Sequence, residues 1–197
     1  MTVSHSINAF STSKKTIITL GTFDGVHLGH QSILKKLLEA TENGVYESVV
    51  ITFYPHPRMV LQQEYSLQLL NSIEEKTVLF EQFGIDHLII HPFDETFSKL
   101  SAEAFVQKIL VDQLHIHKII IGHDHRFGEN RTATIHELIS FGEKYHFEVE
   151  QINAEAINKI AVSSTNIRTA LANGSIQLAN RYLGYDYSFS GKVILGK

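Results

Sequence analysis

Strand-like and helix-like segments alternate along most of this chain, and this alternation limits the possible fold more than any other feature. Short runs of β-branched and other apolar residues recur, and amphipathic segments separate them. Strands that alternate with helices form a mostly parallel sheet with helices on both faces. We therefore expect an α/β fold with a doubly wound, five-stranded parallel sheet. The predicted strands are residues 16–20, 48–53, 87–90, 118–121 and 147–152.

One of the intervening helices has a clear start signal. Ser72 and Glu75 have the spacing of a capping box, in which each side chain accepts a backbone N–H bond near the helix start. The apolar spacing after it predicts that Val78, Leu79 and Phe83 face the core.

Three unusual loops each follow the carboxyl end of a predicted strand. They span residues 21–30, 54–58 and 122–131. In a doubly wound sheet, ligands bind beyond the carboxyl ends of the strands. We therefore expect these loops to share one edge of the sheet and to form the binding site.

The segment 16–31 joins the first predicted strand to the first predicted helix through a glycine turn. Gly21 and Gly25 supply backbone freedom there. Such a turn into a helix N-terminus favours anions, because unpaired N–H groups and the helix dipole face the ligand. His27 and His30 are three residues apart, which places both imidazoles on one side of the first helical turn. We expect them to donate hydrogen bonds to a phosphate.

A second candidate anion site lies near the C-terminus. Residues 162–168 read VSSTNIR and offer three consecutive hydroxyl groups before a predicted helix. Hydroxyl residues at a helix start often serve only as caps. Arg168 lies one turn into the helix, so its guanidinium, the hydroxyls and the helix N–H groups converge as polyphosphate binding requires.

The composition limits the kinds of partner. The formal charge of −4 provides no basic field, so we expect no nucleic acid partner. Cysteine is absent, which excludes disulfides and thiolate metal sites. No apolar run reaches about 18 residues, and residues 1–15 lack the apolar core of a signal peptide. We therefore expect no membrane partner and a cytoplasmic location.

Two histidine pairs could suggest a metal site. His115 with His117 and His123 with His125 are each two residues apart, but such pairs arise by chance among 12 histidines. With no third ligand at a characteristic spacing, we expect no protein-bound zinc. We therefore predict no metal-binding residues in this chain.

Four segments together resemble one family. GTFDGVHLGH, residues 21–30, resembles the signature of the HxGH nucleotidyltransferases. ITFYPHP, GHDHRFGENR and VSSTNIR resemble, in order and spacing, the motifs of the FMN adenylyltransferase (FAD synthetase) module of bacterial bifunctional riboflavin kinase/FAD synthetases. The GHDHRFGENR loop, with the two residues that follow Arg131, departs from that family's usual pattern at Glu129, Thr132 and Ala133. The resemblance implies a Rossmann-like nucleotidyltransferase fold with a C-terminal helical subdomain.

The resemblance also implies site residues. The catalytic group would be His27, His30 and Arg168. The ATP-binding group would be Gly21, Thr22, Phe23, Asp24, His27, Gly29, His30, Ser163, Ser164, Thr165 and Arg168. The flavin-binding group would be Phe53, Pro55, His56, Pro57, Asp124, Arg126, Phe127, Asn130 and Arg131.

The implied reaction transfers AMP from ATP to FMN and releases pyrophosphate with Mg²⁺. His27 and His30 would stabilise charge near the α-phosphorus, and Arg168 would hold the leaving group. One alternative is another HxGH enzyme, such as a cytidylyltransferase or a nicotinamide-mononucleotide or phosphopantetheine adenylyltransferase. A second alternative is a flavin- or nucleotide-binding module without turnover.

The end of the chain changes in character. Residues 187–197 alternate like a strand that has nothing to pair with. We expect residues 1–186 to form the adenylyltransferase domain and residues 187–197 to be the first strand of a riboflavin kinase-like domain that is otherwise missing. We therefore expect no riboflavin kinase activity in this chain.

Overall fold

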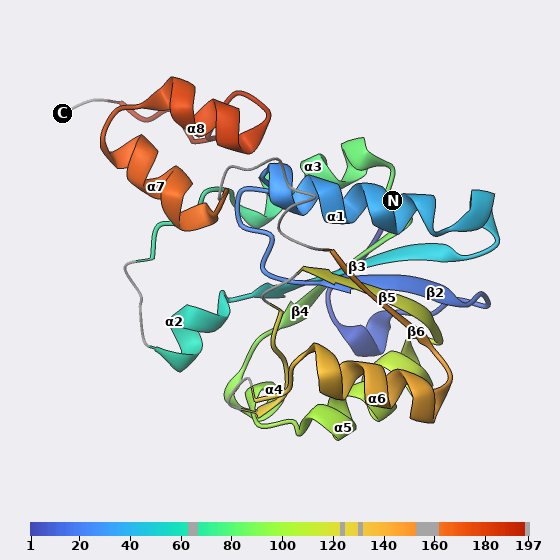
Figure 1. Ribbon diagram of the computed structural model, residues 1–197. Coiled ribbons are helices and arrows are strands. Elements are labelled where there is room, and N and C mark those ends of the chain that lie inside the picture. The colour runs from blue at the N-terminus through green and yellow to red at the C-terminus, as the bar shows by residue number, and fades with distance from the viewer. Residues whose placement is uncertain (63–66, 123–124, 130–131, 153–161, 196–197) are drawn as a thin grey trace.

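A computed structural model describes residues 1–62, 67–122, 125–129, 132–152 and 162–195 of this chain. Its centre is one sheet of six strands in the order β1-β4-β3-β2-β5-β6, and every neighbouring pair is parallel (Figure 1). The predicted doubly wound parallel sheet is confirmed. The strands are β1 (Thr2–Ser4), β2 (Thr16–Leu20), β3 (Glu47–Tyr54), β4 (His87–Pro92), β5 (Ile116–Gly122) and β6 (Glu148–Ile152).

The predicted number of strands was too low, because β1 at the edge of the sheet was missed. Thr2 pairs with His87 and Ser4 with Ile89, so β1 runs parallel to β4. A strand of only three residues carries no hydrophobic period. The exposed edge of β4 decides its conformation, and a local reading of the sequence does not include that edge.

Helices cover both faces of the sheet (Figure 1). The face with α1 and α3 buries Leu34, Leu37 and Phe80 against the strands. The opposite face buries residues of a π-helix, η3, and of α6. The helices up to this point are η1 (Ile7–Ala9), α1 (Leu28–Glu39), η2 (Glu42–Gly44), α2 (Pro57–Leu61), α3 (Ile73–Phe83), α4 (Glu95–Ser98), α5 (Ala102–Ala104), η3 (Phe105–Gln113) and α6 (Ile135–Tyr145).

The start of α3 agrees with the prediction, and its predicted inward face agrees in part, because Leu79 and Phe83 are partly buried and pack against the core. Both reciprocal bonds of the Ser72 capping box are present. Val78, which was expected to face the core, is 53% exposed. The fully inward residues are Lys76 and Phe80. A cap fixes where a helix begins, whereas packing against the sheet and the loop after β2 fixes which face turns inward.

Two short helices form the predicted C-terminal helical subdomain. α7 (Ser164–Ala172) and α8 (Ile176–Leu183) lie beside the start of α1 (Figure 1). They enclose a small separate core with Leu70. Gln31 of α1 donates its amide N–H to the Leu183 carbonyl at 2.7 Å, which ties the subdomain to the main sheet unit.

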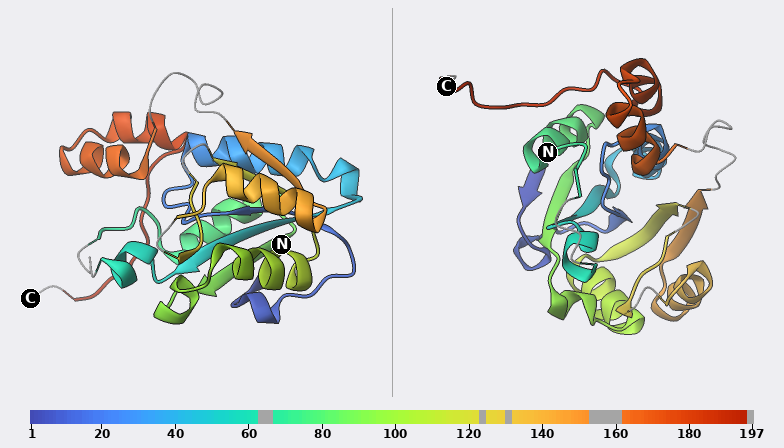
Figure 2. Two further views of the ribbon diagram at one scale, coloured as in Figure 1. Left: turned by 60° about the horizontal axis from the view of Figure 1, so that its bottom comes forward. Right: turned by 90° about the vertical axis from the view of Figure 1, so that its left-hand side faces the viewer.

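The described part of the tail, residues 187–195, forms no strand. Figure 2 shows it as an extended trace that leaves α8 and passes α3, where the Ser190 N–H donates to Glu75 at 2.8 Å. Val193 and Leu195 are 95% and 98% exposed. The assignment of this segment to a second domain stays a prediction.

Among the described helices, none combines the length and the hydropathy that crossing a bilayer requires.

Candidate active site

Three loops lie side by side at one edge of the sheet. β2 pairs with β3 on one side and with β5 on the other, and all three strands run in the same direction. The sheet therefore has its topological switch point between β2 and β5, where ligands bind in this architecture. Figure 1 shows α2, α7 and α8 near this edge. The loops after β2, β3 and β5 share this edge, as expected, and their role in binding stays a prediction; residues 123–124 and 130–131 lie outside the described residues.

The turn after β2 holds an unusual backbone conformation. Phe23 and Val26 have φ values of 47° and 34°, which L side chains rarely adopt. Gly25 has φ of 81°, and a Cβ at this position would lie 2.6 Å from a methyl carbon of Leu70. The turn thus requires glycine at position 25 for two reasons. Strain of this kind persists only where surrounding contacts enforce it, and it is frequent at functional sites.

Aromatic contacts enforce the turn. The Phe23 ring lies between His30 of α1 and Phe80 of α3, with centroid distances of 5.1 and 5.6 Å. His30 in turn stacks on His27, with the ring centroids 3.6 Å apart and the planes 15° from parallel. The two histidines therefore lie on one side of the first turn of α1, as their spacing predicted, and they stack on each other.

The helix cap favours one tautomer of the neutral His27 ring. Its Nδ1 accepts the backbone N–H of His30 at 3.4 Å, so neutral His27 carries its proton on Nε2, where it can donate to a ligand. The pKa of His30 lies well below its usual value because of burial first, then the charges of His27 and Lys76. The His30 Nδ1 is buried with no hydrogen-bond partner in the described structure. The unpaired Nδ1 of a neutral His30 can still pair with a ligand.

Asp24 connects the turn to the C-terminal subdomain. Its side chain is 1% exposed and pairs with the Arg168 guanidinium. The other carboxylate oxygen accepts the Leu70 N–H at 2.9 Å. The Asp24 carbonyl accepts the Ser164 hydroxyl at 2.8 Å, and Arg168 Nε donates to the Gln68 carbonyl at 2.7 Å. The structure thus brings Ser164 and Arg168 to the turn after β2, beside other residues that the family resemblance assigns to the ATP-binding group.

The remaining residues predicted to bind the nucleotide lie nearby. Gly21 donates its N–H to a carbonyl of β3 at 3.0 Å, and Gly29 is buried in the first turn of α1. Ser163 caps α7 by accepting a backbone N–H, whereas Thr165 is exposed. The Thr22 carbonyl accepts two donors that come from β3 and α3. These positions surround the start of α1, and their ligand contacts stay predictions.

Lys76 is a charged residue of the site that sequence reasoning missed. It is 5% exposed, and its Nζ donates to the Thr22 carbonyl at 2.8 Å. Burial lowers the pKa of Lys76 to about 8, although the charge of Asp24 opposes that shift. The available signal was its spacing, because Lys76 is four residues after the Ser72 cap and four before the buried Phe80. Those positions share a helix face.

The loop after β3 places His56 near the same charges. Pro57 occupies the first turn of α2, and His56 caps that helix by accepting the Arg58 N–H on Nδ1 at 3.1 Å. The pKa of His56 is lowered mainly by burial, while the Asp24 charge acts in the opposite direction. Pro55, just before it, is exposed.

Two further residues predicted to bind the flavin, Phe53 and Phe127, belong to a row of aromatic side chains. Phe53 contacts Phe97 at a centroid distance of 5.6 Å, Phe97 contacts Phe105 at 6.2 Å, and Phe105 contacts Phe127 at 6.0 Å. Phe93 also contacts Phe53, at 5.6 Å. The sequence analysis named Phe53 and Phe127, and the structure adds Phe93 and Phe97, which follow the end of β4, to the same row.

The last predicted flavin residues are less informative. Arg126 is exposed. Asp124, Asn130 and Arg131 lie outside the described residues, so their predicted roles stay predictions.

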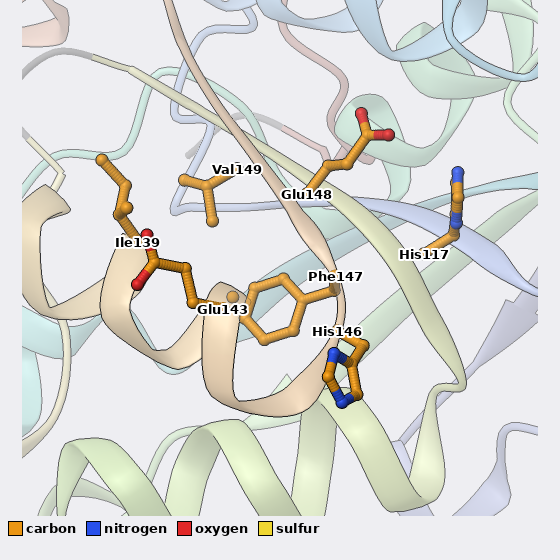
Figure 3. Close-up of a pocket in the computed structure, with 8 residues that line it drawn as sticks. His117, Ile139, Glu143, His146, Phe147, Glu148 and Val149 are labelled. Atoms are coloured by element: carbon orange, nitrogen blue, oxygen red, sulfur yellow. The ribbon is translucent and has the colours of Figure 1, made fainter.

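A hollow elsewhere on the molecule does not belong to this site. It has a volume of about 510 Å³ and lies where α6 ends and β5 and β6 begin, at the opposite edge of the sheet (Figure 3). Figure 3 shows its polar side chains pointing in different directions. In the described ranges, no group of three or more histidine or acidic residues is arranged to hold a metal ion. The residues that line the hollow are His117, Ile139, Gly142, Glu143, His146, Phe147, Glu148 and Val149.

Comparisons with known proteins give a consistent result. A family model described as FAD synthetase matches residues 9–166. A protein from Buchnera aphidicola subsp. Schizaphis graminum, named bifunctional riboflavin kinase/FMN adenylyltransferase, is 40% identical over 93% of this chain and 59% of its own length. Proteins of the same name from Listeria monocytogenes and Escherichia coli K12 are 34% and 31% identical, each over 91% of this chain. This chain spans 57% and 58% of their lengths.

The solved structures support the fold alone. A structure named macrolide-efflux protein from Streptococcus pneumoniae aligns over 93% of this chain and 59% of its own chain, with a TM-score of 0.82 and 24% identity. A pantoate-beta-alanine ligase from Francisella tularensis aligns over 93% of this chain and 78% of its own, with a TM-score of 0.54 and 11% identity.

Proposed function

The chain belongs to the FAD synthetase family, and from this premise we propose that it transfers AMP from ATP to FMN to give FAD and pyrophosphate. The observation that carries the proposal is the stacked His27–His30 pair at the start of α1, which lies beside the turn held by Asp24 and Arg168. Together these groups offer imidazole donors, a helix N-terminus and a guanidinium at the switch point of the sheet. This set suits a triphosphate.

The proposed reaction is one direct displacement. A phosphate oxygen of FMN attacks the α-phosphorus of ATP, and the bond from that phosphorus to the oxygen bridging to the β-phosphorus breaks. Little covalent work falls to the protein, so positioning and charge stabilisation supply most of the rate. His27 donates from Nε2 to oxygens around the α-phosphorus, and His30 stacks against it to hold that direction.

The leaving pyrophosphate is assigned to the start of α7. Arg168 and the hydroxyls of Ser164 and Thr165 face the departing negative charge, which the helix N-terminus also favours. Because Arg168 is paired with Asp24 in the described structure, its guanidinium shares its donors between that carboxylate and the nucleotide.

We assign Mg²⁺ to the nucleotide and not to a cage of protein ligands. Asp24 is the acidic group at the turn, and both of its carboxylate oxygens already accept bonds from Leu70 and Arg168. Mg²⁺ usually keeps several waters and binds phosphate oxygens, so arrival with ATP fits these residues. When bound, it neutralises part of the charge on the phosphates.

The flavin is assigned to the loops after β3 and β5. Phe53 and Phe127 lie in one aromatic row, and His56 follows Phe53 by three residues, at the start of α2. We place the reaction in the cytoplasm. We also keep the division into a transferase at 1–186 and the start of a kinase-like domain at 187–197, which the names and greater length of the relatives support.

The test is a direct assay of the 197-residue polypeptide. It is incubated with ATP, Mg²⁺ and either FMN or nicotinamide mononucleotide, and the products are separated by chromatography. We expect FAD and pyrophosphate with FMN, and no dinucleotide with nicotinamide mononucleotide. A dinucleotide from the second acceptor would favour another HxGH activity. Binding of FMN and ATP without any product would favour a module that lacks turnover.

A further inference from the structure

Lys76 is a buried cation that the proposed reaction has not yet used. It lies on the inward face of α3 and is 5% exposed. A lysine is rarely buried to this extent unless a carboxylate pairs with it. Its hydrogen bond, at 2.8 Å, goes instead to a neutral backbone carbonyl, that of Thr22.

The charges around Lys76 do not cancel. Asp24 is the buried carboxylate of the cluster, and its oxygens are occupied by the Arg168 guanidinium and the Leu70 N–H. One carboxylate therefore faces two cations, Lys76 and Arg168. An excess of buried positive charge is unfavourable in the empty site and becomes favourable when an anion binds.

The same helix also reaches the two histidines. Phe80, one turn after Lys76, packs against Phe23 at a centroid distance of 5.6 Å. Phe23 packs against His30 at 5.1 Å. Lys76 donates a hydrogen bond to the carbonyl of Thr22, the residue just before Phe23. Helix α3 therefore contacts the strained turn at two consecutive residues and supports His30 through Phe23.

We propose that Lys76 is a positioning residue of the transfer site: it fixes the Thr22 carbonyl, and with it the Phe23–His30 contact, and it supplies the positive charge that the bound phosphates balance. This inference rests on the proposed function. Lys76 acts on the reacting groups through the turn after β2 and through His30.

The charge of Lys76 also adds to the lowering of the His30 pKa, after burial and the charge of His27. The groups that face this region are His27 of α1, Asp24 of the turn, Lys76 of α3, His56 at the start of α2, and Arg168 of α7. Burial, His27 and Lys76 all lower the pKa of His30. A neutral imidazole keeps its stacking on His27 and does not add a third buried cation.

The experiment compares two variants with a matched control. Lys76→Met removes the charge and keeps a side chain of similar length, whereas Lys76→Arg keeps the charge. Lys108→Met removes an exposed lysine from η3, far from the turn in the sequence, and is the control. Each protein is tested for kcat/KM in FAD formation, and the His30 imidazole is titrated by NMR without substrates.

We expect Lys76→Met to lower kcat/KM by about 10²-fold, as the loss of an electrostatic group at a reaction site typically does. The His30 pKa rises in this variant, because one of the three causes of its depression is gone. Lys76→Arg leaves the His30 pKa near that of the unaltered protein and recovers part of the activity, and Lys108→Met changes neither.

A His30 titration that is the same in Lys76→Met and in the unaltered protein overturns the proposal, and so does full activity of that variant. Because the NMR titration needs no turnover, it still tests Lys76 if no FAD forms. The absence of FAD would count against the proposed function and not against the effect of Lys76 on His30.

Discussion

At the scale of single residues, the positions of His27 and His30 could be predicted from the sequence, whereas the position of Lys76 could not. His27 and His30 lie where their spacing places them, and their stacking follows from sharing one helical turn. Lys76 gave no comparable signal. Lysine in a helix is usually solvent-exposed, and only the tertiary rotation of α3 turns it inward. The pairing of Asp24 with Arg168 joins residues far apart in the sequence, so no local pattern indicates it.

The two histidines support a prediction about turnover. His27→Asn keeps an N-cap acceptor for α1 but removes the imidazole, so the helix start should survive. We expect this variant, and His30→Ala, to lower kcat by about 10²-fold or more while ATP affinity changes much less. Steady-state kinetics and calorimetry with ATP give the two quantities. His136→Ala, at an exposed position of α6, is the control, and near-normal kcat in either site variant would exclude that histidine from the mechanism.

Lys76 supports a prediction about stability and pH. Its pKa falls from 10.5 to about 8 on folding, so between these pH values the unfolded chain binds more protons than the folded one. The free energy of unfolding should therefore rise with pH through this window, by about 3 kcal/mol for a shift of this size. Lys76→Met should lack this rise and should be more stable than the unaltered protein at pH 7.

Urea unfolding of both proteins between pH 7 and pH 10.5 measures this difference. Tyr185, whose pKa burial raises to about 12, contributes equally to both proteins and cancels in the comparison. Parallel pH dependences would show that Lys76 keeps an ordinary pKa in the folded protein.

At the scale of elements, the sequence located most strands and helix starts well. β2 spans Thr16–Leu20 as predicted, because its β-branched run is bounded by Gly21. The missed β1 and the missed inward position of Lys76 on α3 have one cause. In both, a neighbouring element decides the conformation, through the edge of β4 or the packing of the Phe23 turn. The tail at 187–195 alternates as a strand does but pairs with none of the six strands in the described structure.

The turn after β2 can be tested with two glycines. Gly25 and Gly174 both have positive φ, of 81° and 70°, but only Gly25 is crowded, whereas Gly174 has no heavy atom within 4 Å of an added Cβ. Gly174→Ala should cost about 1 kcal/mol from backbone conformation alone. Gly25→Ala must also displace Leu70, so it should cost clearly more and should lower activity, because the Leu70 N–H holds Asp24. Thermal unfolding of both variants checks this order, and equal losses would mean that the turn relaxes without cost.

At the scale of the whole molecule, the strand order explains why four distant motifs meet. The sheet places β3, β2 and β5 side by side, so the loops after them share an edge, and α7 is held there by Asp24. The alternating pattern of the sequence predicted this edge without reference to any family. The contacts that fix α7 against the turn required the structure.

The central claim is that the site at this edge of the sheet cleaves the bond between the α-phosphorus of ATP and the oxygen bridging to the β-phosphorus, and transfers AMP to FMN. The most direct measurement uses ATP labelled at the α-phosphorus or, in a parallel reaction, at the γ-phosphorus, with FMN or riboflavin as acceptor. With FMN we predict that the α-label enters FAD and the γ-label leaves in pyrophosphate, with no label on the protein. With riboflavin we predict that neither label is transferred. Release of ADP, or transfer of the γ-label to either acceptor, would contradict the account.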